Sequence, residues 1–179
     1  MAVDDVAGGY LAVSHLTSTG RTRIAFVGGP HALRQVADRL AGARKAIAEH
    51  TGATLESIDT DSLSVLQGRA VGEQLRARNP ADRPDAVFAA NDLLAIGVPQ
   101  AFSMLGDVQV PRDVALIGYD DIAFASAAVV PLSSIRQPSA LMGYTAVDLL
   151  LREAADGEAF DHEQIEFQPE LVVRESTGG

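Results

Sequence analysis

The chain has 179 residues, enough for one domain or two small lobes. Its 47% hydrophobic and 21% charged content excludes disorder as the dominant state, and the absence of cysteine excludes disulfides and thiolate chemistry. The net charge of −10 repels nucleic acid and anionic lipid. No apolar run is long enough to cross a membrane and no signal peptide is visible, so we expect a cytoplasmic protein without a membrane partner.

Helical and strand patterns alternate along the chain. In chain order they predict a helix over 5–19, a strand over 23–27, a helix over 33–50, a strand over 54–58, a helix over 63–78 capped by Ser62, a strand over 85–90, a helix over 91–105, strands over 113–119 and 132–135, a helix over 139–155 and an extended segment over 164–173. Short apolar strands between helices of about 15 residues are typical of a parallel sheet covered on both faces. The predicted fold class is doubly wound α/β.

In this class, ligands bind beyond the carboxyl ends of the strands. The residues of interest therefore lie in the loops 28–34, 59–63, 90–92, 119–122 and 136–139. Motif searches there favour neither a cofactor nor a metal. There is no P-loop, no G-x-G-x-x-G, no G-x-S-x-G, and the four histidines are scattered. We expect no cofactor, no metal and no enzymatic activity.

Polar residues at strand ends each allow two interpretations. Asp4-Asp5 and the pair Asp59 and Asp61 are interpreted as solvated loop charges. Asp120-Asp121 follows a strongly apolar strand, where it either binds ligand hydroxyls or caps the next helix. Asn91 either caps its helix or faces a ligand, or does both. For Arg39, one turn into its helix, position alone favours a surface side chain lying along apolar neighbours.

Several longer motifs occur together and in order. They are Gly20-Arg-Thr-Arg-Ile-Ala-Phe-Val-Gly-Gly-Pro30, Arg39-Leu-Ala-Gly42, Asp85-Ala-Val-Phe-Ala-Ala-Asn-Asp-Leu-Leu-Ala-Ile-Gly97, Val110-Pro-Arg-Asp-Val-Ala-Leu-Ile-Gly-Tyr-Asp-Asp-Ile122, Ile135-Arg-Gln-Pro138 and Pro169-Glu-Leu-Val-Val-Arg-Glu-Ser-Thr177. Together they span nearly the whole chain. This set resembles the LacI/GalR family of bacterial transcriptional repressors.

The resemblance implies a periplasmic-binding-protein-like fold of two α/β lobes with an effector in the cleft between them. Residues 4–135 and 169–179 then form the C-terminal lobe, and 136–168 form the crossover and a helix-strand segment of an otherwise missing N-terminal lobe. The resemblance also implies a homodimer that contacts DNA only through a missing N-terminal domain. The helix beginning at Asn91 and residues near 122–130 resemble the family's subunit interface, but Pro99 departs from the family pattern and puts that packing in doubt.

By position, four polar residues resemble the family's effector contacts: Arg39, Asn91, Asp120 and Gln137. Val3 and Leu63 fall where the family places apolar or aromatic contacts. An Arg fork, an amide and a carboxylate together suit a hydroxyl-rich ring, so we expect a small-molecule effector, with a sugar favoured over a purine or another metabolite. Two other hypotheses stay open: a periplasmic-type sugar-binding protein of a transporter, and a flavodoxin-like enzyme.

The segment 139–168 carries apolar residues that the resemblance places against the missing lobe. Met142, Ala146, Leu149 and Leu150 share one face of its predicted helix, with Leu141 beside them. We expect this face to be hidden by pairing with another copy or to leave the segment mobile. The alternative is that the helix folds back onto its own lobe.

Overall fold

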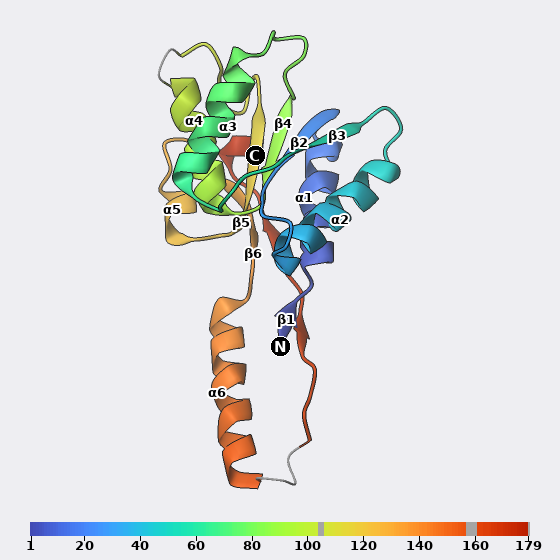
Figure 1. Ribbon diagram of the computed structural model, residues 1–179, viewed down its shortest axis with the longest axis vertical. Helices are drawn as coiled ribbons and strands as arrows, with labels where there is room; N and C mark the ends of the chain where they lie inside the picture. Colours follow the sequence, from blue (N-terminus) through green and yellow to red (C-terminus); the bar gives the residue numbers. More distant parts are fainter. Residues whose placement is uncertain (104–105, 157–160, 179) are drawn as a thin grey trace.

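The main body of the protein is a lobe built on a six-stranded sheet. A computed structural model describes residues 1–103, 106–156 and 161–178 (Figure 1). The strand order is β3-β2-β4-β5-β6-β8, and all neighbours are parallel except β6 and β8. The strands are β2 (Arg23–Val27), β3 (Thr54–Ile58), β4 (Ala86–Ala89), β5 (Ala115–Asp120), β6 (Ser133–Arg136) and β8 (Glu170–Val172). This confirms the predicted α/β class with a mainly parallel sheet.

Two helix pairs cover the two faces of this sheet. Helix α1 (Asp5–Ser18) packs against α2 (Arg34–Ala48), and α3 (Val65–Ala77) packs against α4 (Asp92–Ser103) on the other side (Figure 1). The first pair lies close because Gly9 has no side chain: a Cβ there would stand 2.0 Å from the Arg39 carbonyl oxygen. The lobe also carries a short helix, α5 (Ala123–Ser126), and the 3-10 helix η2 (Glu175–Thr177).

The core sits between the helices and the sheet. All four residues of β4 are buried, as are the first five residues of β5. Phe26 and Phe88 meet edge to face across the neighbouring strands β2 and β4, with ring centroids 5.3 Å apart. Because both faces of these strands are covered, their sequences are continuous apolar runs, which is the pattern expected for a buried parallel sheet.

A second part of the chain projects away from the lobe. After β6 the chain forms α6 (Ser139–Asp156), and it returns through β7 (Glu166–Phe167), which pairs in parallel with β1 (Ala2–Val3) (Figure 1). Helix α6 stands apart from the lobe's helices, so it does not fold back onto them. Its exposed side chains include Leu141, Tyr144, Val147, Leu150 and Leu151. On the expected face, Met142 and Leu149 are partly covered, whereas Ala146 and Leu150 are exposed.

Several predicted boundaries differ from the structure. Ser64, not Ser62, caps α3 by accepting a hydrogen bond from the Gln67 backbone N–H. The extended segment 164–173 splits between two sheets, because β7 pairs with β1 and β8 pairs with β6. Helix α4 continues through Pro99 to Ser103, and the predicted end at 105 lies outside the described residues. Among the described helices, none is long and apolar enough to cross a bilayer.

A matched pair of leucine substitutions tests the separation of α6 from the core. We expect Leu116→Ala, in β5, to lower the free energy of unfolding by about 2–5 kcal/mol, because it empties a buried site. Leu150→Ala, in α6, should change it by less than about 0.5 kcal/mol, because that side chain is already exposed. Urea denaturation followed by circular dichroism measures both, and equal losses would mean that α6 packs on the lobe in solution.

Candidate functional site

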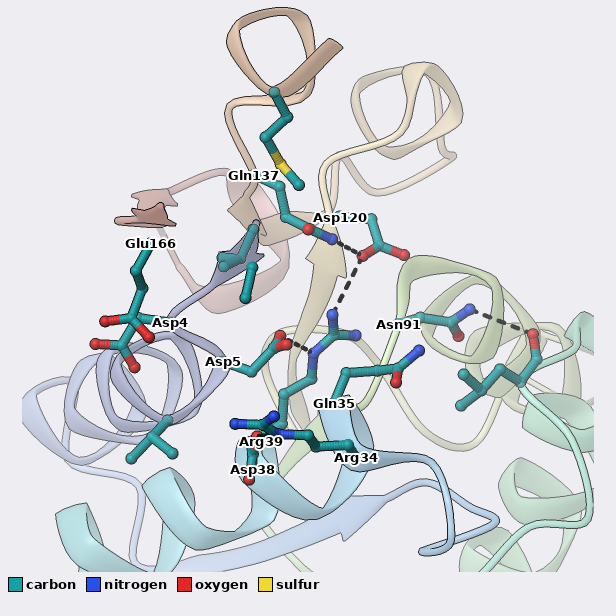
Figure 2. Close-up of a pocket in the computed structure, with 15 residues that line it drawn as sticks. Asp4, Asp5, Arg34, Gln35, Asp38, Arg39, Asn91, Asp120, Gln137 and Glu166 are labelled. Carbon is teal, nitrogen blue, oxygen red and sulfur yellow. Dashed lines mark hydrogen bonds and ion pairs between the residues drawn. The ribbon is translucent and has the colours of Figure 1, made fainter. Parts of the chain in front are cut away.

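A cleft of about 530 Å³ opens at the carboxyl ends of the lobe's strands. The lobe, the strand β1 and the projecting segment all contribute to its walls (Figure 2). The residues that line it are Ala2, Val3, Asp4, Asp5, Val6, Arg34, Gln35, Asp38, Arg39, Leu63, Asn91, Asp120, Gln137, Met142 and Glu166. All six residues singled out from the sequence are therefore brought together in one cavity, although they are spread over 135 positions of the chain.

Arg39 lies at the floor of this cleft and is only 4% exposed. Its Nη1 donates to the carbonyl oxygen of Ala90 at 2.6 Å, and its Nε donates to Asp5 Oδ1 at 2.8 Å. Its guanidinium carbon lies 3.5 Å from the centre of the Tyr119 ring, in a cation–π contact. The interpretation of Arg39 as a surface side chain is therefore wrong. A buried guanidinium needs partners, and they come from three distant parts of the chain.

The same contacts correct the interpretation of Asp4-Asp5 as solvated charges. Asp5 pairs with Arg39, and only 14% of its side chain is exposed. Asp4 caps α1 by accepting a hydrogen bond from the Ala7 backbone N–H at 2.8 Å. The other pair differs, because Asp59 is largely exposed and its hydrogen bond with His31 lowers its pKa. Adjacent carboxylates thus have unlike roles that their sequence pattern does not distinguish.

Asp120 faces the cleft from the end of β5 (Figure 2). Its Oδ1 accepts a hydrogen bond from Gln137 Nε2 at 2.6 Å and lies 3.7 Å from Arg39 Nη2. Burial raises the pKa of Asp120, and the nearby Arg39 charge opposes that shift. Of the two interpretations left open, the helix cap is wrong, since α5 begins after Ile122 with no side-chain cap.

Asp121, the next residue, points to different partners. Its carboxylate pairs with Arg136 at 2.6 Å and with Arg174 at 2.7 Å. Burial raises the pKa of Asp121, but these two ion pairs outweigh burial and lower it. Asp120 and Asp121 both have positive φ angles, 101° and 51°, which is uncommon for residues other than glycine. The chain therefore turns sharply here, so that Asp120 faces the cleft while Asp121 forms ion pairs with Arg136 and Arg174.

Asn91 serves as the helix cap. Its Oδ1 accepts a hydrogen bond from the Leu94 backbone N–H at 3.0 Å, and its Nδ2 donates to the Leu63 carbonyl oxygen at 3.3 Å (Figure 2). The amide also lines the cleft. Val3 is buried on β1, and Leu63 is half-buried in the loop between β3 and α3; both line the cleft and offer it apolar surface. The two apolar positions therefore share one cavity with Arg39, Asp120 and Gln137.

Three residues important to this arrangement escaped the sequence analysis. The sequence pattern predicts a solvated Asp5 and indicates no role for Tyr119 beyond its place in a strand. Asp92, the first residue of α4, is fully buried. Its Oδ1 accepts from the Ser134 hydroxyl at 2.7 Å and its Oδ2 from the Ile122 backbone N–H at 2.8 Å. The only sequence signal for Asp92 is that a charged residue follows a cap at the end of an apolar strand.

Comparison with known proteins identifies the family. The family model described as a periplasmic binding protein-like domain matches residues 13–177. The chain is 36% identical to the HTH-type transcriptional regulator MalR of Streptomyces coelicolor over 97% of this chain and 50% of MalR. The chain belongs to the LacI/GalR family. It spans about half the length of the curated relatives it matches.

Two solved structures of LacI-family regulators resemble this chain in fold. A LacI-family regulator from Enterococcus faecium with bound ribose has a TM-score of 0.88 and 30% identity, over 97% of this chain and 63% of that one. The lac repressor dimer bound to operator and an anti-inducer has a TM-score of 0.83 and 30% identity, over 98% of this chain and 51% of that one. The fold of this chain is therefore the periplasmic-binding-protein-like fold of LacI-family effector domains.

The buried carboxyl of Asp92 predicts a pH-dependent stability. Burial raises its pKa to about 6, although the bonds from Ser134 and Ile122 oppose the shift. Between about pH 4 and pH 6, the folded protein then binds more protons at this group than the unfolded chain does, so its contribution to stability falls as pH rises. Asp92→Asn mimics the protonated form. It should gain up to about 3 kcal/mol over the parent protein between pH 4 and pH 7.

Urea denaturation at several pH values measures this difference. Other carboxylates, such as Asp113, have lowered pKa values and titrate equally in both proteins, so subtracting the two curves isolates Asp92. A difference that stays constant from pH 4 to pH 7 would contradict the prediction.

Proposed function

We propose that this chain is the effector-binding domain of a LacI-family transcriptional repressor, and that its cleft binds a sugar. The observation that carries this proposal is the convergence of Arg39, Asp120 and Gln137 in one cleft beside apolar Val3 and Leu63. A guanidinium and an amide donate to hydroxyl oxygens, and a carboxylate accepts from hydroxyl groups. The apolar side chains suit the C–H face of a ring. The relative from Enterococcus faecium that binds ribose supports the same ligand class.

The position of the cleft supports a role in signalling rather than in catalysis. Its walls come from the lobe and also from Met142 on α6 and Glu166 on β7, which belong to the projecting segment. A ligand that contacts both parts favours one relation between them over another, which is the requirement for a population shift. We further infer that residues 4–135 and 169–179 form one lobe and that 136–168 belong to a second one.

In this proposal, DNA is contacted by a separate N-terminal domain and not by the acidic chain described above. Such a regulator works on the chromosome, which places it in the cytoplasm. The cleft needs no cofactor or metal for this task, because binding alone shifts the population.

Paired substitutions in the cleft test the proposed binding. We expect Arg39→Ala and Asp120→Ala each to weaken binding of the preferred sugar by about 5- to 150-fold, which corresponds to about 1–3 kcal/mol for a lost buried partner. Titration calorimetry with D-ribose and a panel of other free monosaccharides measures the affinity. Arg44→Ala, on the same helix as Arg39, and Asp59→Ala are the matched controls, because both side chains are exposed and neither lines the cleft, and they should change affinity less than twofold.

Unchanged affinity in both cleft variants would contradict the site. Binding of none of the monosaccharides by the parent protein, at concentrations up to several millimolar, would contradict the sugar class.

We also propose that the chain forms a homodimer through α4 and the residues after α5. A second cavity, of about 300 Å³, is lined mainly by apolar residues that include Ile96, Pro99 and Val110. Val129 lies on the wall of this cavity with its side chain fully exposed. A projecting apolar side chain beside an apolar hollow is self-complementary, as a twofold interface requires. Because α4 continues through Pro99, this surface stays intact despite the departure from the family pattern.

The dimer is tested by introducing charge at its centre. Val129→Asp should convert the protein from dimer to monomer in analytical ultracentrifugation, because a buried unpaired charge is costly. Leu66→Asp is the control: Leu66 is 77% exposed on α3 and lies outside the cavity, so its variant should remain a dimer. If the Val129→Asp variant remains a dimer and dissociates only when Leu150 on α6 is also changed to Asp, the proposed interface is wrong and the dimer forms through α6.

A further inference from the structure

The turn after β5 places Asp120 in the cleft, and its backbone conformation requires stabilising contacts. Asp120 and Asp121 have consecutive positive φ values of 101° and 51°. A positive φ is uncommon for a residue other than glycine and persists only where the surroundings fix it. The contacts of the Asp120 side chain alone do not explain the turn, since Gln137 is itself only half-buried. The backbone of residues 121–122 must therefore be anchored elsewhere.

Two successive backbone N–H groups of the turn lead to one buried side chain. The Ile122 N–H donates directly to Asp92 Oδ2 at 2.8 Å. The Asp121 N–H donates to Ser134 Oγ at 3.1 Å, and that hydroxyl donates in turn to Asp92 Oδ1 at 2.7 Å. Both oxygens of Asp92 are thus used, one for each N–H. No other described side chain accepts a hydrogen bond from either of these N–H groups.

The surrounding packing reserves space for this carboxylate. Asp92 is fully buried, and a Cβ on Gly118 of β5 would lie 2.2 Å from its Oδ1. Only glycine at 118 therefore lets Asp92 reach the turn. Asp92 also stands at the N-terminus of α4, where the helix dipole favours a negative charge. A buried carboxylate that is this closely accommodated, and that does not line the cleft, is placed to support the cleft from behind.

We propose that Asp92 is the positioning residue of the binding cleft: through Ile122 and Ser134 it fixes the 120–122 turn and so holds the Asp120 carboxylate against Gln137 and Arg39. The use of the held carboxylate for sugar rests on the proposed function, but the positioning itself does not. Asp92 does not touch the ligand in this arrangement. Its effect on binding passes through Asp120.

The first experiment follows the turn without any ligand. In the parent protein, burial keeps the pKa of Asp120 above its ordinary value. In Asp92→Ala the turn loses both anchors, so the carboxyl should move toward solvent and its pKa should fall toward the ordinary value for aspartate. Carboxyl ¹³C chemical shifts over a pH series report that titration. Amide hydrogen exchange at Asp121 and Ile122 should become at least tenfold faster in the same variant.

Two further variants separate positioning from a general loss of structure. Asp92→Asn keeps an oxygen acceptor for the Ile122 N–H and should restore slow exchange at that position. Asp113→Ala is the matched control, because Asp113 also accepts a backbone N–H, that of Gln109, but near the other end of β5. It should leave both Asp120 and the turn unchanged. If Asp92→Ala does not fold, Ser134→Ala removes the Asp121 link alone and should speed exchange at Asp121 more than at Ile122.

The second experiment measures binding. With the monosaccharide that the parent protein prefers, Asp92→Ala should lose at least tenfold in affinity, and Asp92→Asn should recover most of it. In an Asp120→Ala background, Asp92→Ala should cause no further loss, because the two residues act through one contact. Additive losses would overturn the positioning role, as would an unchanged Asp120 titration in a folded Asp92→Ala protein. If no monosaccharide binds, the proposed function fails, while the titration and exchange results still decide the role of Asp92.

Discussion

The cleft depends on the burial of one guanidinium. Arg39 leaves water almost completely, and a buried charge is tolerated only when it is paired and its donors are satisfied. Asp5 supplies the opposite charge, Ala90 supplies a carbonyl, and the Tyr119 ring lies against the flat face. These groups come from α1, from the end of β4 and from β5, so the charge of Arg39 ties three elements of the lobe together at the cleft.

In the proposed function, the partners of Arg39 leave its Nη2 group available to a ligand. Its Nη2 lies 3.7 Å from Asp120, which is longer than a normal hydrogen bond, so the two groups attract each other without closing the gap. A ligand hydroxyl placed between them could donate to the carboxylate and accept from the guanidinium. Gln137 lies between β6 and α6 and donates a hydrogen bond to Asp120, so a movement of that carboxylate would change the hydrogen bond. The cleft is thus connected directly to the segment that leaves the lobe.

A second group of charged side chains lies where the chain leaves the lobe after β6 and returns to it at β8. Arg136, the last residue of β6, pairs with Asp121 and also with Glu170 at 2.7 Å, the first residue of the returning strand β8. Asp120 and Arg136 are direct neighbours in the β5–β6 register. Asp120, which faces the cleft, and Asp121, which pairs with Arg136 of β6, are therefore consecutive residues of one sharp turn. A displacement of that turn changes the cleft and the crossing together, which is how a local binding event can act on a larger motion.

The sequence by itself determined the class of fold and the set of cleft positions. Apolar runs such as 85–90 are long enough to show a buried parallel strand, and the resemblance to the LacI/GalR family implied that Arg39, Asn91, Asp120 and Gln137 face one cleft. Only the tertiary structure decided which charged side chains are buried and which groups they pair with. Asp5 and Asp59 are alike in sequence, each one of a close pair of acids, yet the first is buried against Arg39 and the second is exposed. Burial of a charge depends on partners far away along the chain, and local patterns carry no information about them. The same holds for Asp92, whose partners Ile122 and Ser134 are 30 and 42 residues away.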